Sequence, residues 1–160
     1  KIGSALCTLE GDESALATVL ALRDVCGVCH RKIASSDKPL YHAAAVCASN
    51  LAVGLFASAQ TMLERCGFGA DEARGALRSL FVGNCESIAE RGPIDALTGP
   101  IERNDAETVV GHLMAFREDP TLLKERDAYT ALSRVVVEVA AAKHPERDYS
   151  HIAEILRAAR

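Results

Sequence analysis

The chain has 160 residues, of which 49% are hydrophobic and 25% are charged, so it can form one globular domain with a core and is not a disordered segment. Eighteen basic and 22 acidic residues give a net charge of −4, and because the basic residues are scattered we expect no nucleic acid partner. Aromatic residues make up only 4% and alanine occurs 27 times, which favours closely packed helices over a sheet.

The pattern of residues 1–35 predicts a short strand, helix, strand unit. An apolar alternation over residues 4–10 leads into a turn, where Asp12 can cap a helix that ends at Gly27. Residues 28–33 have the pattern of a second strand. Because so small a unit cannot bury both faces of its sheet, we expect it to be the tail of a larger α/β domain.

The pattern of residues 36–160 is helical. A long helix is expected over residues 36–66, with Ser36 as its cap and Pro39 in its first turn. No residue from Pro39 to Leu63 is charged, and the run is as long as a membrane span. Polar residues lie inside it, however, so we expect no membrane but a helix that is buried from every side in a bundle or a dimer. These polar residues are His42, Ser49, Asn50, Ser58, Gln60 and Thr61.

The rest of the chain predicts four further helices separated by clear breaks. They are expected over residues 70–91, from Asn104 or Asp105 to Arg117, over 120–143 and over 150–160. Gly92-Pro93 ends the first of them, and Leu97-Thr98-Gly99-Pro100 is expected to be a loop. The apolar stripe of that first helix is Ala73, Leu77, Leu80, Phe81 and Ile88, with Asn84 inside it. We therefore predict a mainly α fold, a multi-helix bundle around one long buried central helix.

One cysteine motif has the spacing of a covalent haem attachment site, Cys26-Gly27-Val28-Cys29-His30. Haem proteins of this kind are exported, whereas the N-terminus has no signal-peptide layout, so a redox dithiol or small buried thiols are the alternatives, and we favour the thiols. The six cysteines are irregularly spaced and predict no disulfide framework, which favours a cytoplasmic setting. No metal site is expected, because zinc would need two more ligands.

A polar strip on the long apolar helix is the more informative cluster. At about 100° per residue, Lys38, His42 and Ser49 share a narrow arc, and Asn50 flanks it. Polar groups on a buried helix need partners, so the strip is either a binding site or a set of satisfied core groups with a solvated lysine. No Gly-x-Gly-x-x-Gly follows a strand, and we do not expect the chain by itself to hold a dinucleotide.

Several short segments occur along the chain in a recognisable order. They are Gly11-Asp12, Lys38-Pro39-Leu40-Tyr41-His42, Ser49-Asn50, Leu97-Thr98-Gly99-Pro100-Ile101 with Arg103 and Asp105, and His112-Leu113. In this order the chain resembles, up to about residue 143, the C-terminal helical domain of uncharacterised bacterial proteins described as NAD(P)-dependent oxidoreductases. It is more distantly similar to the helical domains of ketopantoate reductases, pyrroline-5-carboxylate reductases and other beta-hydroxyacid dehydrogenases.

The resemblance implies a fold like the C-terminal domain of 6-phosphogluconate dehydrogenase and a substrate-binding and dimerisation domain over residues 36–160. It implies a homodimer, a small carbonyl, imine or hydroxy acid as substrate, and NADP or NAD held mainly by an N-terminal Rossmann domain. Lys38 and His42 would be the catalytic groups. The candidate substrate-binding residues are Ser49, Asn50, Asn84, Thr98 and Gly99. His42 stands where the relatives carry Asn, which favours the alternative of a non-catalytic helical module for assembly or ligand sensing.

Overall fold

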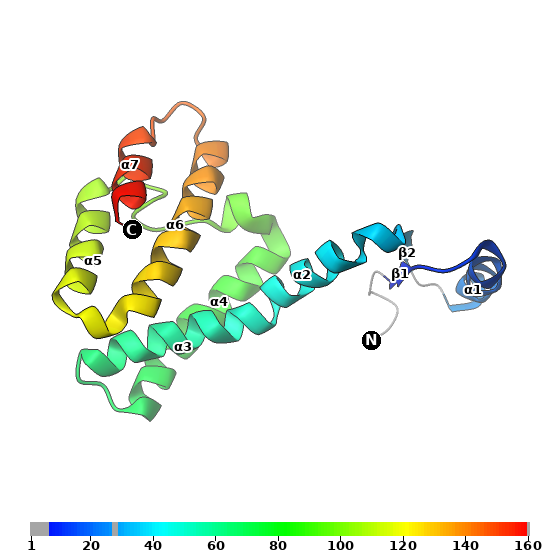
Figure 1. Cartoon of the computed structure of the whole chain (residues 1–160), viewed down its shortest axis with the longest axis horizontal. Coiled ribbons are helices and arrows are strands. Elements are labelled where there is room, and N and C mark those ends of the chain that lie inside the picture. The colour runs from blue at the N-terminus through cyan, green and yellow to red at the C-terminus, as the bar shows by residue number, and fades with distance from the viewer. Residues whose placement is uncertain (1–6, 27–28, 160) are drawn as a thin grey trace. The chain divides into compact units, whose positions relative to one another are not determined.

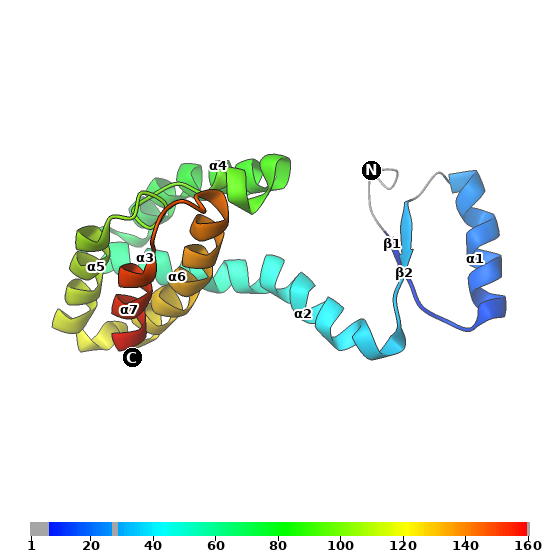
Figure 2. The same cartoon turned by 90° about the horizontal axis from the view of Figure 1, so that it is seen from above.

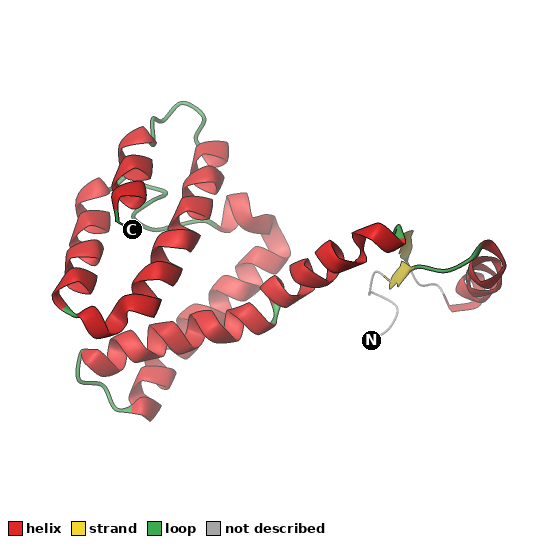
Figure 3. Cartoon of the chain, in the orientation of Figure 1, coloured by secondary structure: helices red, strands yellow, loops and turns green. Residues whose placement is uncertain are grey.

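The computed structural model describes residues 7–26 and 29–159, and helices predominate in it, as Figure 3 shows. Two compact units divide the chain, Lys1–Ala52 and Val53–Arg160. The mainly α fold class is therefore confirmed. The assignment of residues 1–35 and 36–160 to two domains stays a prediction, because a division into compact units does not test it.

The first unit contains the predicted strand, helix, strand arrangement. Strand β1 (Cys7–Leu9) pairs in parallel with β2 (His30–Lys32), and helix α1 (Glu13–Cys26) connects them (Figure 2). Asp12 caps α1 as expected, since its Oδ1 accepts a hydrogen bond of 2.8 Å from the amide of Ala15. The helix stop expected at Gly27, the start of the second strand at Val28 and the first three residues of the strand expected over 4–10 lie outside the described residues.

The long helix expected over residues 36–66 is divided into two. A 3₁₀ turn, η2 (Ser35–Asp37), precedes α2 (Lys38–Ala48), and α3 (Asn50–Arg65) follows after Ser49. Pro39 lies in the first turn of α2 as predicted, whereas Ser36 lies within η2 and does not cap the helix. Ser49 has φ −124° and ψ −77°, and its Oγ donates to the carbonyl oxygen of Ala45 at 2.6 Å. The amide of Ser49 donates to the carbonyl of Val46 at 3.2 Å, so the last turn of α2 is tightened at the break.

The expectation that this apolar segment is buried is wrong for the single chain. No residue of α2 or α3 is buried, and Leu40 and Val53 are 76% and 71% exposed. Segment Ser35–Arg65 is long and apolar enough to cross a membrane, since it contains an 18-residue window with a mean hydropathy of 1.5. Within the second unit, the ring of Phe56 on α3 meets that of Phe81 edge to face, with 5.2 Å between the ring centroids.

The second unit continues with four helices and one 3₁₀ turn. They are α4 (Ala70–Ala96), α5 (Ala106–Glu118), η3 (Pro120–Leu122), α6 (Leu123–Lys143) and α7 (Ser150–Ala158). The predicted break in α4 is present at Gly92, whose φ of +79° suits glycine, and the helix resumes at Pro93. Of its expected apolar stripe Ala73 is buried, but Leu80 is 70% exposed. Of the two candidate caps for α5, Asp105 is the one that accepts from the amide of Thr108, at 3.0 Å.

The core of the second unit lies between α5, α6 and α7, which run side by side in Figures 1 and 2. Val109, Ile152 and Leu156 are its largest fully buried side chains. They are packed against a loop, residues 97–105, through the buried Ile101. Ile152 and Leu156 are four residues apart, so they lie on the same side of α7, and this side packs against the core.

Candidate functional site

The polar strip begins at Lys38, the first residue of α2. Its Nζ lies 2.8 Å from Oε2 of Glu10, the residue that follows β1. Hydrogen bonds from Lys38 and Ser35 hold the pKa of Glu10 below its usual value, so this carboxylate is ionised beside the ammonium. Glu10 was not foreseen as a partner from the sequence, although its place at the carboxyl end of a parallel strand, where ligands bind in open α/β sheets, gave a signal.

His42 lies one turn after Lys38 and is exposed. Within the described residues it makes no hydrogen bond or ion pair, so both ring nitrogens are available to a ligand. An imidazole beside an ammonium can accept or deliver a proton while the ammonium polarises a carbonyl oxygen. The catalytic roles of the two residues stay predictions.

Ser49 and Asn50 lie at the break between α2 and α3. Besides the carbonyl of Ala45, the hydroxyl of Ser49 reaches Oδ1 of Asn50 at 3.1 Å, and since it carries one hydrogen it can donate to only one of them at a time. The sequence placed Lys38, His42, Ser49 and Asn50 along one strip on the assumption of an unbroken helix. Because the backbone departs from helical geometry at Ser49, helical spacing does not place Asn50 beside this strip.

The other predicted substrate-binding residues, Asn84, Thr98 and Gly99, belong to the second unit. Asn84 is exposed in α4, and Thr98 is exposed in the loop that follows. Gly99 has φ +106°, a conformation that only glycine adopts easily, so the Thr-Gly-Pro step forms a specific turn. Lys38, His42, Ser49 and Asn50 lie in the first unit, and a cleft that all seven share stays a prediction.

The loop of residues 97–105 is held in place by the C-terminal part of the chain. The carbonyl oxygen of Glu102 accepts from Oη of Tyr149 at 2.8 Å and from Nη1 of Arg147 at 3.0 Å. The Glu102 carboxylate lies 2.5 Å from Nε2 of His144, and Lys143 donates to the carbonyl of Leu97 at 2.7 Å. The hydrogen bond with His144 is the main reason that the pKa of Glu102 is below its usual value, while burial opposes it. The loop that carries Thr98 and Gly99 is therefore rigidly supported.

A pocket of about 510 Å³ in the second unit was missed from the sequence. Nδ1 of His112 lies 2.9 Å from Oη of Tyr129, and Phe116 stacks at a tilt against the same tyrosine. Burial raises the pKa of Tyr129. Arg65 also lines the pocket and adds a positive charge, and its Nη2 donates to Oγ1 of Thr121 at 2.8 Å. The pocket thus combines aromatic rings with the polar pair of His112 and Tyr129. In the sequence, the only signal for this pocket was that His112 belongs to one of the segments that carry the resemblance.

The described cysteines correct one expectation. Cys29, Cys47, Cys66 and Cys85 are free and exposed in the single chain, so they are not small buried thiols. Of the haem-like motif, Gly27, Val28 and the side chain of Cys26 lie outside what the structure describes. The side chain of Cys7 lies outside it as well. No group of three or more metal-ligating side chains occurs within the described residues.

Comparison with known proteins gives one result. A family model described as a domain of unknown function, DUF2520, matches residues 5–136. No curated protein and no solved structure matches the chain. The matched segment includes the strand pair, the apolar segment and the loop that carries Thr98 and Gly99.

Proposed function

The chain belongs to the DUF2520 family, and from this premise we propose that it is the substrate-binding and dimerisation part of an NAD(P)-dependent oxidoreductase. Its substrate is a small carbonyl compound, imine or hydroxy acid. The observation that carries the proposal is the pairing of Lys38 with Glu10 at the carboxyl end of β1. An ammonium held at a strand end, with a free imidazole one turn away, is suited to an anionic or carbonyl substrate.

The strand pair supports a larger α/β domain. β1 and β2 are parallel and three residues long, and parallel sheets are normally covered on both faces and extended by further strands. Within the described residues only these two strands pair. We therefore propose that the sheet is completed by strands of a Rossmann-type domain beyond these residues.

The chain's own βα turn does not fit a dinucleotide. Glu10, Asp12 and Glu13 surround the start of α1, and their carboxylates would repel a pyrophosphate at the helix N-terminus. In our proposal NADP or NAD is therefore bound by the Rossmann-type domain, and the roles assigned to this chain concern the substrate alone. Lys38 donates to a substrate carbonyl or carboxylate, and His42 holds or moves a proton.

The exposed apolar surface of α2 and α3 supports dimerisation. Uncharged residues from Pro39 to Leu63 leave large side chains such as Leu51 and Val53 uncovered, and an apolar surface of this extent marks an interface. The polar side chains within the run favour a protein partner over lipid, since the imidazole of His42 and the amide of Gln60 would be costly inside a bilayer. We propose a homodimer in the cytoplasm with no membrane contact.

A catalytically inactive helical module is the second candidate function. It is favoured by His42, which replaces the Asn of the resembling reductases. Such a module would keep the apolar interface and the supported loop but would turn over no substrate.

The test uses the full-length protein that contains this domain, with its nicotinamide cofactor. Oxidation of the reduced cofactor is followed with panels of 2-oxo acids, cyclic imines and hydroxy acids, for the parent and for Lys38→Ala. Turnover of one class that Lys38→Ala lowers supports the reductase. Turnover that Lys38→Ala leaves unchanged would overturn the assignment of the site, and a dimer that turns over no panel member would favour the inactive module.

A further inference from the structure

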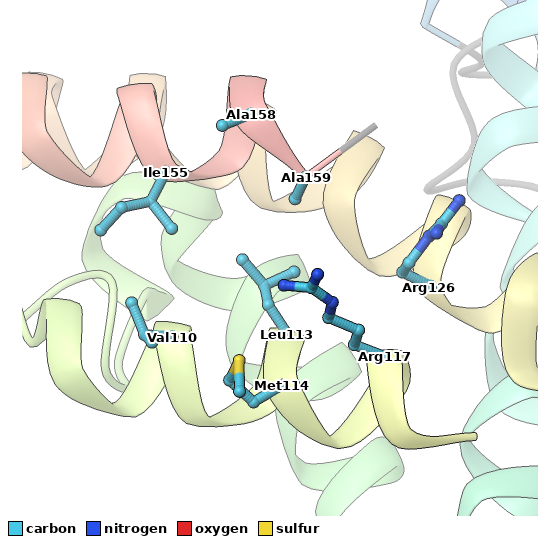
Figure 4. Close-up of a pocket in the computed structure, with 8 residues that line it drawn as sticks. All are labelled: Val110, Leu113, Met114, Arg117, Arg126, Ile155, Ala158 and Ala159. Atoms are coloured by element: carbon cyan, nitrogen blue, oxygen red, sulfur yellow. The ribbon is translucent and has the colours of Figure 1, made fainter. Parts of the chain in front are cut away.

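A second cavity lies between α5 and α7 and is separate from the residues discussed so far. It measures about 560 Å³. Figure 4 shows Val110, Leu113 and Met114 on α5 facing Ile155 on α7, with the guanidinium of Arg117 close to Leu113, whereas the guanidinium of Arg126 points away from them. A cavity of this size can take a small organic ligand.

The lining combines apolar side chains with two arginines, and none of the described residues that line the cavity is a Ser, Cys, His, Asp or Glu. It therefore offers binding without a nucleophile or a general base. Arg117 makes no hydrogen bond or ion pair within the described part of the chain, and in Figure 4 its guanidinium extends back along α5 toward Leu113. Its five donors are available to a ligand anion.

The neighbouring cavity adds to the positive charge. It measures about 320 Å³ and shares Arg126 and Ala159 with the first. Arg134 lines it, and although its Nη2 donates to the carbonyl of Leu156 at 3.0 Å, its Nε is buried without a partner. Because this Nε has almost no accessible surface, a ligand in the cavity cannot bond to it, and the charge of Arg134 can act on an anion only from a distance.

Of the arginines that line these two cavities, Arg126 is paired with Asp127 at 2.9 Å, and Nη2 of Arg134 donates to the carbonyl of Leu156. Arg117 is therefore the arginine that is best placed to bind a ligand. We propose that this site binds a small amphipathic anion. The anionic group, a carboxylate or a phosphate monoester, is held by Arg117, and the hydrocarbon part contacts Leu113 and Ile155.

The two methionines of the chain make a specific test possible. Met114 lines the proposed site, whereas Met62 lines the pocket of His112 and Tyr129, so their methyl groups report on separate cavities. The chain is labelled with ¹³C-methyl methionine, the signals are assigned with Met114→Leu, and octanoate and octyl phosphate are titrated below their micelle concentrations. Octanol, which lacks the charge, and acetate, which lacks the hydrocarbon chain, are the matched controls.

We expect the Met114 methyl signal to shift saturably with octanoate or octyl phosphate while the Met62 signal does not move. The ligand with the lower Kd shows whether the site prefers a carboxylate or a phosphate monoester. Arg117→Gln should weaken binding about tenfold or more, Arg117→Lys less, and the exposed Arg78→Gln not at all. The proposal is overturned if Met114 does not respond, if octanol binds as tightly as the anions, or if Arg117→Gln binds like the parent.

Discussion

The ammonium of Lys38 and the carboxylate of Glu10 lie 2.8 Å apart, which joins the first residue of α2 to the end of β1. The ammonium sits near a helix N-terminus, where the dipole disfavours a positive charge, and the carboxylate offsets this. Both side chains are exposed enough for the pair to open, 66% for Lys38 and 27% for Glu10. A substrate carboxylate could therefore replace Glu10 as the partner of Lys38.

The first prediction follows from this exchange. In the full-length protein, Lys38→Ala should weaken substrate binding or turnover about tenfold or more, because a charge-assisted hydrogen bond is lost. The melting temperature should change little, since exposed ion pairs contribute little to stability. The exposed Lys124→Ala on α6 is the control and should behave like the parent. An unchanged kcat/KM for Lys38→Ala would remove the lysine from the site.

His42 is tested by a pair of substitutions. His42→Asn restores the residue that the resembling reductases carry and keeps a donor and an acceptor, whereas His42→Ala removes both. Because His42 is exposed and has no partner within the described residues, neither change should affect folding. We expect kcat/KM to be higher for His42→Asn than for His42→Ala. Equal values for both variants and the parent would contradict a role in the reaction.

The secondary structure was largely predictable because its signals are local. Asp12 and Asp105 cap their helices as expected, and Gly92-Pro93 breaks α4 where predicted. The break at Ser49 was missed, since a hydroxyl that bonds the carbonyl four residues earlier also occurs in unbroken helices, as at Thr61 in α3. Burial was also misjudged, because apolar residues show that a surface must be covered but not by which chain.

The candidate site was predicted less well than the fold. Residues on one helix, such as Lys38 and His42, can be grouped by helical spacing, whereas Glu10 comes from a distant segment and is brought to Lys38 only by the strand pairing. The pair of His112 and Tyr129 likewise depends on how α5 packs on α6. Spacing along the sequence carries no information about such contacts.

Dimerisation is tested by two matched leucines. Leu55 on α3 and Leu132 on α6 are both 46% exposed, so an aspartate at either position should affect the stability of the single chain similarly. Only Leu55 lies in the proposed interface. We expect the parent and Leu132→Asp to sediment as dimers at micromolar concentration and Leu55→Asp to sediment as a monomer, because a buried unpaired carboxylate opposes association. A monomeric parent would contradict the prediction.

The support of the loop at residues 97–105 predicts a stability effect. Tyr149 is 5% exposed, and its Oη donates to the carbonyl of Glu102. Tyr149→Phe should lower the free energy of unfolding by about 0.5–1.5 kcal/mol, the usual range for one hydrogen bond, since Arg147 still satisfies the carbonyl. Urea denaturation at pH 7 measures this. The exposed Tyr41→Phe is the control, and an equal effect of the two changes would argue against the contact.

The Glu102 carboxylate makes the stability of the second unit depend on pH. Its pKa in the folded chain is below the usual value of 4.5, mainly because of the hydrogen bond with His144. The folded state therefore binds its proton less readily than the unfolded state does, and the resulting stabilisation is complete above the unfolded pKa. It is lost as the pH falls through the lower folded pKa. Acidification from pH 5 to pH 3 should thus reduce the contribution of this contact.

Glu102→Gln isolates this contribution from those of the other carboxylates. The amide cannot ionise, so the free energy of unfolding of Glu102→Gln should fall less between pH 5 and pH 3 than that of the parent, and at pH 7 the variant should be the less stable of the two. Glu90→Gln, an exposed change on α4, should follow the parent over the whole range. Urea denaturation at each pH gives the three curves. If the curves of Glu102→Gln and the parent run parallel, the contact between Glu102 and His144 does not govern the acid stability of the unit.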